Sequence, residues 1–572
     1  MSATDTSEAH EVEAPAAEEV PVSEPWSPGT DHKVVGTLFV VVGLLFLVAA
    51  GVLALVLRAQ MAGPDAGVVG RTTYRELYTL HGVLGVFCFL GPVWVGLATA
   101  MVPLQIGATR LAFPRLQSLA LWLVVVGGAM IVAAPFMNGA DVISGWALST
   151  PVPDGASFSG HGPDLLILGL AIVCIALVAA SVNLMVTVLK MRAPGLTLRR
   201  APLFSWSVLV SSSILLLALP VLVGALVMLF VDRHYGGHIF NGFTGSGGGD
   251  PLLWPRLFWF AAYPTLWALL LPGLGVASEI VPVAARRRMF SHQRATLAIG
   301  AVGILAFAGW GSQLHSLTRA RFIFGVGAIV VLLPVASLLL NWLATLAIAM
   351  RQHTAGPKNL KTAPMVYAGG FIALLGLGMV GWAAAVVSGN AGRSNYWQAA
   401  SQHTLFFGAA TLAVVAALAY WAPKLWGRHL SDKASLPTSV LLSGGMVVTF
   451  GAFFVLAYQG LAMHASSFSD TDLTPANLVA GIGSAITGLG LLAFVADLCV
   501  NVIAGRGRQA DPDPWTGHTL EWSTSSPPPS YNFDRLPEIR SEAPMLDLRS
   551  ASDSLTGPGG VPIAATVARA SG

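Results

Sequence analysis

Long apolar runs alternate with short polar segments along almost the whole chain. Each run is close to the roughly 20 residues that an α-helix needs to cross about 30 Å of hydrocarbon. A helix can cross lipid because its backbone groups are bonded internally. The pattern therefore predicts an all-α integral membrane protein of about twelve transmembrane helices. The predicted spans are residues 34–58, 78–102, 116–137, 163–189, 203–231, 257–284, 295–314, 322–350, 364–388, 399–422, 436–463 and 475–503.

Two polar segments flank this apolar region and divide the chain into three parts. Residues 1–33 are acidic and rich in Ala, Glu and Pro, which predicts a disordered N-terminus. Residues 34–504 form the transmembrane domain. Residues 505–572 are polar, and the stretch beyond Pro527 is rich in Pro, Ser and Gly. This composition predicts a mostly irregular C-terminal tail.

The composition agrees with lipid as the surrounding solvent. Of the 572 residues, 54% are hydrophobic and only 10% are charged, whereas about a quarter are charged in soluble domains. The net charge of +3 is spread over many loops, so nucleic-acid binding has no support. Cys88, Cys174 and Cys499 lie within predicted spans without Cys-x-x-Cys spacing, which favours packing roles over a disulfide framework or thiolate metal site.

The orientation follows from Lys and Arg in the short loops, because positive loops stay in the cytoplasm. With a cytoplasmic N-terminus, the loops on that side carry about twice as many Lys and Arg residues as the outer loops. We therefore predict that both termini are cytoplasmic.

Placing an ionisable side chain inside lipid costs free energy, so the few that occur there are the first candidates for functional residues. His81 begins the second predicted span and His403 begins the tenth, and both spans enter from the outer side. Two neutral imidazoles on facing helices at one depth can supply both axial ligands of a haem iron. The alternative is that each is a hydrogen-bonded core histidine. His315 and His464 also lie near outer helix ends, so depth alone does not single out one pair.

The surrounding stretches resemble subunit I of the haem-copper oxidases along nearly the whole chain. They keep the order, spacing and helical placement of that family, whose fold has twelve helices. They are HKVVGTLF from His32, LHGVL from Leu80, VPLQIGATRLAFPR from Val102, DRH from Asp232, GGGDPLLWPRLFWF from Gly247, SEIVP from Ser278, NWLATL from Asn341, PMVYAGGF from Pro364, the segment 420–428 and DPWTGHTLEWSTSSPPPSYNF from Asp513.

The resemblance implies a low-spin haem held by His81 and His403, at the positions of the family's two ligands. Arg58 matches an arginine that bonds a substituent of this haem; the alternative is an arginine that extends to the lipid boundary. The resemblance also implies a bacterial plasma membrane, partner subunits like II and III, and an electron donor such as cytochrome c or a quinol. The haem type stays open.

The chain departs from the family at the residues that bind oxygen. The three copper ligands correspond to Tyr263, Ser312 and Gln313, and the axial ligand of the second, high-spin haem corresponds to Ser401. Copper of this type requires three imidazoles, and the nearby His315 could replace only one. Trp267 stands where the family has a redox tyrosine. The sequence therefore predicts that copper is absent.

The family's proton routes and outer polar sites are also altered. Their key acids and lysine correspond to Arg110, Thr265 and Leu338. Glu279 and Asp497 lie near inner helix ends, where capping or surface roles are favoured over a proton relay. The family's outer His-Asp metal pair corresponds to Arg393 and Ser394, and the arginines that hold the haem propionates correspond to Ser466 and Ser467.

Three hypotheses follow. The first is a respiratory membrane cytochrome that keeps one low-spin haem for electron transfer, without oxygen reduction or proton pumping. The second is an active terminal oxidase subunit that reduces oxygen with electrons from cytochrome c. The third is a structural or assembly paralogue without a cofactor. Because a function belongs to its site and not to its fold, the oxidase reaction is not carried over from the resemblance alone.

Overall fold

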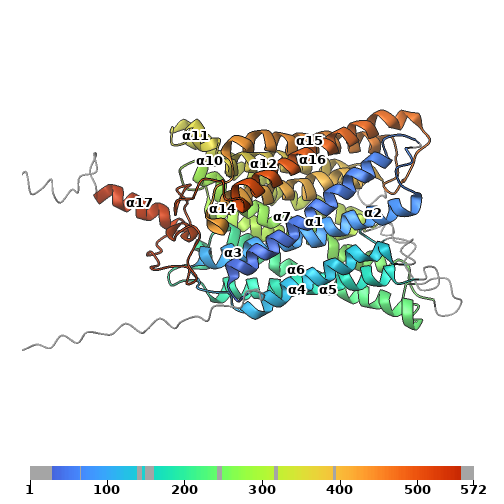
Figure 1. Cartoon of the computed structure of the whole chain (residues 1–572), viewed down its shortest axis with the longest axis horizontal. Coiled ribbons are helices and arrows are strands. Elements are labelled where there is room, and N and C mark those ends of the chain that lie inside the picture. The colour runs from blue at the N-terminus through green and yellow to red at the C-terminus, as the bar shows by residue number, and fades with distance from the viewer. Residues whose placement is uncertain are drawn as a thin grey trace, which may run out of the picture.

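The computed structural model describes residues 29–64, 66–137, 145–148, 160–240, 248–314, 320–390 and 395–555. In these segments the chain is a bundle of long, roughly antiparallel helices (Figure 1). The α-helices are α1 His32–Gln60, α2 Arg71–Val83, α3 Gly91–Ile106, α4 Pro114–Ala133, α5 Gly162–Lys190, α6 Leu203–Tyr235, α7 Leu253–Ala284, α8 His292–Leu305, α9 Arg321–Val330, α10 Leu332–Arg351, α11 Pro357–Leu360, α12 Ala363–Val387, α13 Tyr396–Gln402, α14 Ala409–Trp426, α15 Asp432–Tyr458, α16 Thr474–Leu498 and α17 Pro544–Leu555.

Short segments of other helical types join or extend these helices. Three are π-helices: η1 Leu84–Leu90, η5 His403–Gly408 and η7 Cys499–Ile503. The 3₁₀ segments are η2 Ala134–Phe136, η3 Leu198–Arg200, η4 Trp310–Gln313, η6 Thr471–Leu473 and η8 Leu520–Ser523. Through η1 and η5, α2 continues into α3 and α13 continues into α14.

Eleven helical segments of the described chain are long and apolar enough to cross a membrane. The prediction of an all-helical membrane bundle is confirmed. The predicted span 295–314 differs in form, because α8 has 14 residues and gives way to turns and η4. Gly309 lies against Tyr263, where a Cβ atom would come within 2.4 Å of the phenol oxygen. Glycine disfavours helix and permits this close approach, so the helix stops early.

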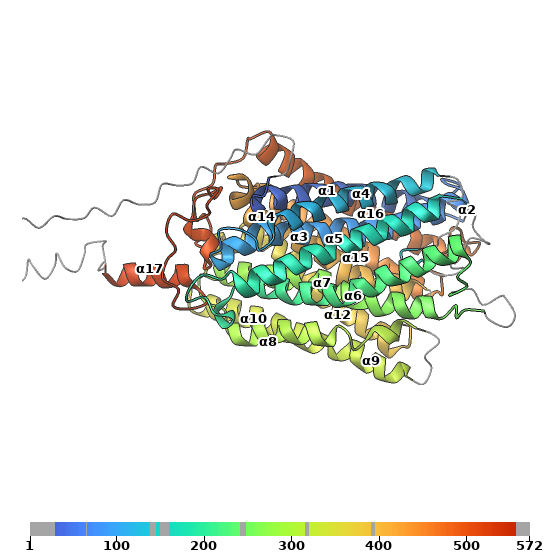
Figure 2. The same ribbon diagram turned by 90° about the horizontal axis from the view of Figure 1, so that it is seen from below.

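The segment α8–η4 still completes the even number of crossings that the chain ends require. The start of α1 and the described tail lie at the same end of the bundle, hereafter the tail end (Figure 1). Figure 2 shows α8 and α9 along one edge of the bundle. Eleven long segments would leave the chain ends on opposite sides, so α8–η4 supplies the remaining pass.

The centre of the bundle is formed by three continuous helical segments. The most apolar window of α7 is entirely buried, and those of α2–α3 and α13–α14 are 94% and 89% buried. The equivalent windows of α1 and α16 are only 22% buried. A helix that is apolar on all sides is stable either at the centre of a large core or against lipid. The central helices therefore carry the interior side chains, and the outer helices face the bilayer.

Small residues allow close contact between helices, both from the outer helix α1 to the central helix α3 and between the outer helices α15 and α16. A Cβ atom on Gly36 of α1 would come within 2.6 Å of the Gly96 carbonyl on α3. Gly445 of α15 and Gly483 of α16 make the same kind of approach. Close backbone contact through small residues is a main source of helix association in lipid, where burial of apolar surface between helices gains little.

The described tail packs onto the tail end of the bundle, with α17 projecting beyond it (Figure 1). Glu521 of η8 is fully buried, and its Oε1 atom accepts hydrogen bonds from Gln105 Nε2 at 3.0 Å and Trp421 Nε1 at 3.3 Å. Burial raises the pKa of this carboxyl group above its ordinary value. Asn532 is also buried, and its amide donates to the carbonyl of Ala108 at 2.8 Å. The tail residues around Glu521 and Asn532 are thus part of the folded core.

Lys424 fastens the tail, which leads to a testable prediction. Its Nζ atom donates to the carbonyl oxygens of Pro512, Thr524 and Ser525 at 2.8, 2.7 and 3.2 Å. Lys424→Met is expected to weaken tail docking by about 1.5–3 kcal/mol, because hydrogen bonds from a charged donor are lost. Limited proteolysis within residues 511–530 should become roughly tenfold faster or more.

The exposed Lys433 provides the matched control for this experiment. Lys433→Met should leave the cleavage rate unchanged. Equal rates for the Lys424 variant and the native chain would show that Lys424 does not hold the tail.

Candidate functional site: two facing histidines in an apolar cavity

The structure brings His81 and His403 together in the half of the bundle farther from the tail end. Their ring centroids are 6.3 Å apart and their planes differ by 8°. The Nδ1 atom of His81 lies 2.9 Å from the carbonyl oxygen of Ala50, and that of His403 lies 2.8 Å from the carbonyl oxygen of Ala399. A carbonyl only accepts, so both Nδ1 atoms carry hydrogen. The neutral rings therefore keep their Nε2 lone pairs available for a metal.

Both histidines border a π-helix. His403 is the first residue of η5, and η1 begins three residues after His81. At η5, Ala399 accepts from both the ring and the backbone N–H of His403. One π-helical turn contains an extra residue and changes the direction of the side chains that follow, and such turns occur frequently at functional sites. The two π-helices thus mark the same level of the bundle as the histidine pair.

The distance between the rings matches the spacing of two axial ligands. Two metal–nitrogen bonds of about 2 Å, plus roughly 1 Å from each nitrogen to its ring centre, place the centroids about 6 Å apart. The observed distance is 6.3 Å, with nearly parallel planes. At this distance, ring nitrogens that lie on the line between the two centroids are too far apart for a direct hydrogen bond. This centroid distance leaves room for one metal ion between the rings.

Two cavities adjoin the histidine pair and provide space for the rest of a flat, apolar cofactor. One has a volume of about 370 Å³ and lies among α1, α13–η5, α15 and α16. The other has a volume of about 160 Å³ and lies among α1, α2–η1 and η5. His81 and His403 line both. Gly51 and Ala399 also line both, and their small side chains leave room beside the rings. The residues present therefore fit a haem.

Arg58 lies at the edge of the larger cavity. Its Nη2 atom donates to the Tyr396 hydroxyl at 2.9 Å, and its guanidinium lies 5.1 Å from the Phe453 ring centre. Its Nη1 atom is buried without a hydrogen-bond partner, and no ion pair joins Arg58 to a carboxylate within the described part of the chain. A buried cation with a free donor is suited to an acceptor or anionic group in the cavity.

His464 lies outside this pair. Its ring is 5.6 Å from the ring of Tyr78, in an edge-on arrangement, and it lines neither cavity. Burial, together with the charge of Arg75, lowers its pKa below the ordinary value for histidine. The structure therefore separates His81 and His403 from His464, which depth along the predicted spans did not do. His315, Arg393 and Ser394 lie outside the described residues.

Aromatic side chains fill the region around Tyr263 and Trp267. Both side chains are fully buried on α7. The Trp267 ring lies edge-on to Phe406 at 4.9 Å, and Phe406 lies edge-on to Trp382 at 5.4 Å. Tyr263 packs against Trp382 at 6.0 Å. This contact network joins α7, α12 and η5 through side-chain packing.

Neutral polar side chains stand at three further positions that correspond to metal ligands of the family, namely Ser312, Gln313 and Ser401. The Ser401 hydroxyl donates to the carbonyl of Trp397 at 2.8 Å, and Gln313 Nε2 donates to Ser312 Oγ at 3.3 Å. All these side chains are buried. Among the described residues, no group of three or more His, Cys, Asp or Glu side chains is placed to hold a metal ion.

Glu279 and Asp497 both bond to helix ends. Glu279 Oε1 accepts from the backbone N–H of Phe204, in the first turn of α6, at 3.2 Å. Asp497 accepts from the backbone N–H of Ser431, the residue that caps α15. A carboxylate near a helix N-terminus satisfies free N–H groups and interacts favourably with the helix dipole. These contacts favour capping, as the sequence predicted.

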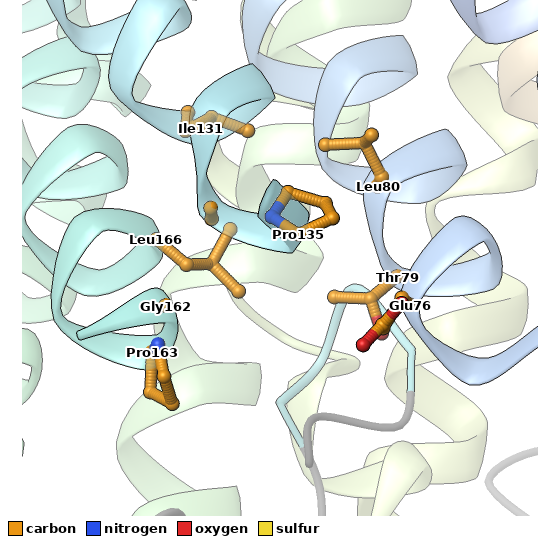
Figure 3. Close-up of a pocket in the computed structure, with 9 residues that line it drawn as sticks. Glu76, Thr79, Leu80, Ile131, Pro135, Gly162, Pro163 and Leu166 are labelled. Carbon is orange, nitrogen blue, oxygen red and sulfur yellow. The ribbon is translucent and has the colours of Figure 1, made fainter. Parts of the chain in front are cut away.

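A third, smaller cavity lies on another face of α2 (Figure 3). It has a volume of about 30 Å³ and is lined by Glu76, Thr79 and Leu80 together with residues of α4, η2 and α5. A space of this size accommodates about one water molecule, so it is no cofactor site. Thr79 Oγ1 accepts from the backbone N–H of Gly145 at 2.8 Å, which anchors the loop containing Trp146.

Sequence reasoning missed several residues that line the histidine cavities. Trp146 and Met463 come from loops, while Tyr78 and Gln402 lie within one turn of the two histidines. The spacing of Tyr78 and Gln402 could have indicated them, because neighbouring residues on a helix share a level. No sequence signal indicates Trp146 or Met463, since loop paths are set by tertiary contacts.

The fold defines an all-helical, multi-pass membrane protein. The chain matches the family model of "Cytochrome C and Quinol oxidase polypeptide I" over residues 34–486. It is 33% identical over 544 residues to the "Probable cytochrome c oxidase subunit 1-alpha" of Streptomyces coelicolor, covering 93% of this chain and 92% of the relative. It is 32% identical over 536 residues to "Cytochrome c oxidase subunit 1" of Bacillus subtilis, covering 92% and 83%.

A solved structure shows the same fold. This is a heme-copper terminal oxidase dimer determined by cryo-EM, with a TM-score of 0.68, 17% identity and coverage of 84% of each chain. The chain therefore belongs to the haem-copper oxidase subunit I family. It is a membrane protein of the respiratory chain with bacterial relatives. The predicted family is confirmed.

Proposed function

We propose that this chain is a membrane cytochrome that keeps one bis-histidine low-spin haem for electron transfer, without oxygen reduction or proton pumping. The observation that carries the proposal is the pair of near-parallel imidazoles, His81 and His403, 6.3 Å apart beside apolar cavities. When bound, the haem supplies one-electron redox chemistry. The protein residues hold the ring, exclude water and keep the ligand tautomers through the carbonyls of Ala50 and Ala399.

The proposal excludes the oxidase reaction because of the residues at the second metal site. Copper of the family type requires three imidazoles, but the corresponding side chains are Tyr263, Ser312 and Gln313. The position of the high-spin haem ligand is Ser401, whose hydroxyl is bonded to its own helix. The packing of Trp267 against Phe406 supports the view that side chains occupy the space of the second haem.

The absence of pumping is proposed from the residues on the proton routes. A relay through the bilayer needs ionisable or hydroxylated side chains in sequence. Arg110 and Leu338 replace an acid and a lysine of the family, and Thr265 replaces the acid at the end of one route. The Thr265 hydroxyl donates to the carbonyl of Ala261 at 2.8 Å, as a helix-bound threonine does.

The proposed setting is the bacterial plasma membrane with both termini in the cytoplasm. The excess of Lys and Arg in the loops at the tail end supports this orientation. Subunits like II and III of an oxidase are the proposed protein partners. Cytochrome c or a quinol-linked protein is the proposed source of electrons, since the chain contains no Cys-x-x-Cys-His attachment motif.

A redox spectrum of the purified protein tests the proposal. We expect one haem per chain, a reduced spectrum typical of a six-coordinate haem, no change on addition of carbon monoxide, and no stoichiometric copper by elemental analysis. His81 and His403 would both hold the haem iron, which would leave no site on it for an added ligand. A carbon-monoxide-reactive haem together with copper would refute the proposal.

An active terminal oxidase subunit is the second candidate, favoured by the 32% identity to "Cytochrome c oxidase subunit 1" of Bacillus subtilis. It predicts cyanide-sensitive oxygen uptake by the complex with subunit II. A cofactor-free structural or assembly paralogue is the third candidate. It predicts a colourless protein whose partner binding does not depend on His81 or His403.

A further inference from the structure

Gln402 is a buried amide without a partner, one residue before His403. Its side chain is 3% exposed, and its Nε2 atom is buried with no hydrogen-bond partner in the described structure. The side chain lines the cavity of about 160 Å³ that His81 and His403 share. A buried N–H group is costly when it is left unpaired, and native proteins rarely leave one so. The adjoining cavity is the space in which a bound group can supply the acceptor.

The walls of this cavity offer hydrogen-bond donors to an acceptor group. Apart from the two histidines, the polar side chains that line it are Gln402, Tyr78, Trp146 and Thr411. Thr411 already donates to the carbonyl of Phe407 at 2.7 Å. Tyr78 and Trp146 carry an O–H and an N–H group respectively. The lining includes no carboxylate, so a ligand with peripheral oxygen atoms meets donors without repulsion.

The two arginines that hold the haem propionates in the family are also replaced in this chain. Ser466 and Ser467 stand at the positions of two family arginines. The backbone carbonyl of Ser466 accepts from Gln60 Nε2 at 3.2 Å, so this loop is held by an amide contact. A haem carboxylate in this chain therefore needs donors from elsewhere in the two cavities, which offer Arg58 in the larger cavity and neutral side chains in the smaller one.

We propose that Gln402 is a haem-positioning residue whose amide donates to a peripheral oxygen of the haem, most directly a propionate carboxylate. This inference rests on the proposed bis-histidine haem. Since residues 402 and 403 are adjacent, one helical segment holds both the iron and the edge of the ring. The bond restricts rotation of the haem about the axis through the two histidines and partly neutralises the carboxylate charge near the iron.

The test compares Gln402→Leu with Gln398→Leu in the purified full-length protein. Gln398 is a buried amide on the same helix, α13, that lines neither cavity, and it provides the matched control. Gln402→Leu is expected to keep one haem and to shift its midpoint potential to lower values, because a less neutralised carboxylate disfavours the reduced iron. The propionate bands in the resonance Raman spectrum should shift as well. Gln398→Leu should change neither property.

A second variant covers the case in which Gln402→Leu loses haem or fails to fold. The carboxyl group of Gln402→Glu is similar in size to the amide and donates only when it is protonated. We expect its midpoint potential to rise more steeply on acidification than in the native protein. A native potential and Raman spectrum in Gln402→Leu with haem retained, or a native pH slope in Gln402→Glu, would overturn the inference. Absence of haem from the native protein would instead refute the proposed function.

Discussion

Replacing His403 by alanine is expected to lower the haem content per chain by roughly tenfold or more, because an axial ligand is lost. His81→Ala should have the same effect. In the native structure the two rings are 6.3 Å apart, and each is oriented by one backbone carbonyl. Loss of either ring leaves an iron site open and a gap in the wall between the cavities. The measurement is haem per polypeptide, from the absorption spectrum and extracted pigment.

His464→Ala serves as the matched control. This histidine is also partly buried in the same half of the bundle, but it contacts Tyr78 and lines neither cavity. The haem content of the His464→Ala variant should remain native. Native haem content in both His81→Ala and His403→Ala would contradict the site. Equal loss in all three variants would indicate general misfolding.

The second large effect is expected for Trp267→Ala. The Trp267 side chain is fully buried, and its ring packs edge-on to Phe406 at 4.9 Å. Removing a buried tryptophan loses its transfer free energy and leaves a cavity, for an expected cost of about 3–5 kcal/mol in the free energy of unfolding. We expect lower thermal and denaturant stability in detergent, without any gain of oxygen or carbon monoxide reactivity.

Trp122 of α4 is the matched control, since it is 51% exposed on the outer surface of the bundle. Trp122→Ala should change the free energy of unfolding by no more than about 0.5 kcal/mol. A native stability for Trp267→Ala would mean that the side chain does not support the bundle. Carbon monoxide binding by this variant would point to a haem in the space next to Phe406.

The histidine variants and the Trp267 variant test two parts of this subunit that have different roles. The histidine pair defines a site for chemistry, whereas the aromatic contacts among Trp267, Phe406 and Trp382 stabilise the packing of α7, η5 and α12. The π-helix η5 carries part of both features, through His403 and Phe406. Family membership accounts for the scaffold, but the function follows from the side chains at each site.

Most of the fold was predictable from the sequence alone. The apolar runs located the membrane-crossing helices because the lipid core demands a minimum length and internal backbone bonding. The family resemblance added the order of the helices. The span at 295–314 was predicted less well, because hydropathy does not show where Gly309 and Gly311 meet neighbouring side chains and end a helix.

The candidate site was only partly predictable. The sequence determined which residue types are present, namely two histidines at similar depth, one arginine near them, and no imidazoles at the copper positions. The tertiary structure decided how the two histidines named by the family resemblance meet. It oriented His81 through Ala50 of α1, 31 residues away in the chain, separated His464 from the pair, and left the amide of Gln402 unpaired beside the cavity. Hydropathy depends on composition over one helix, whereas ring angles, tautomers and cavities depend on contacts between several helices.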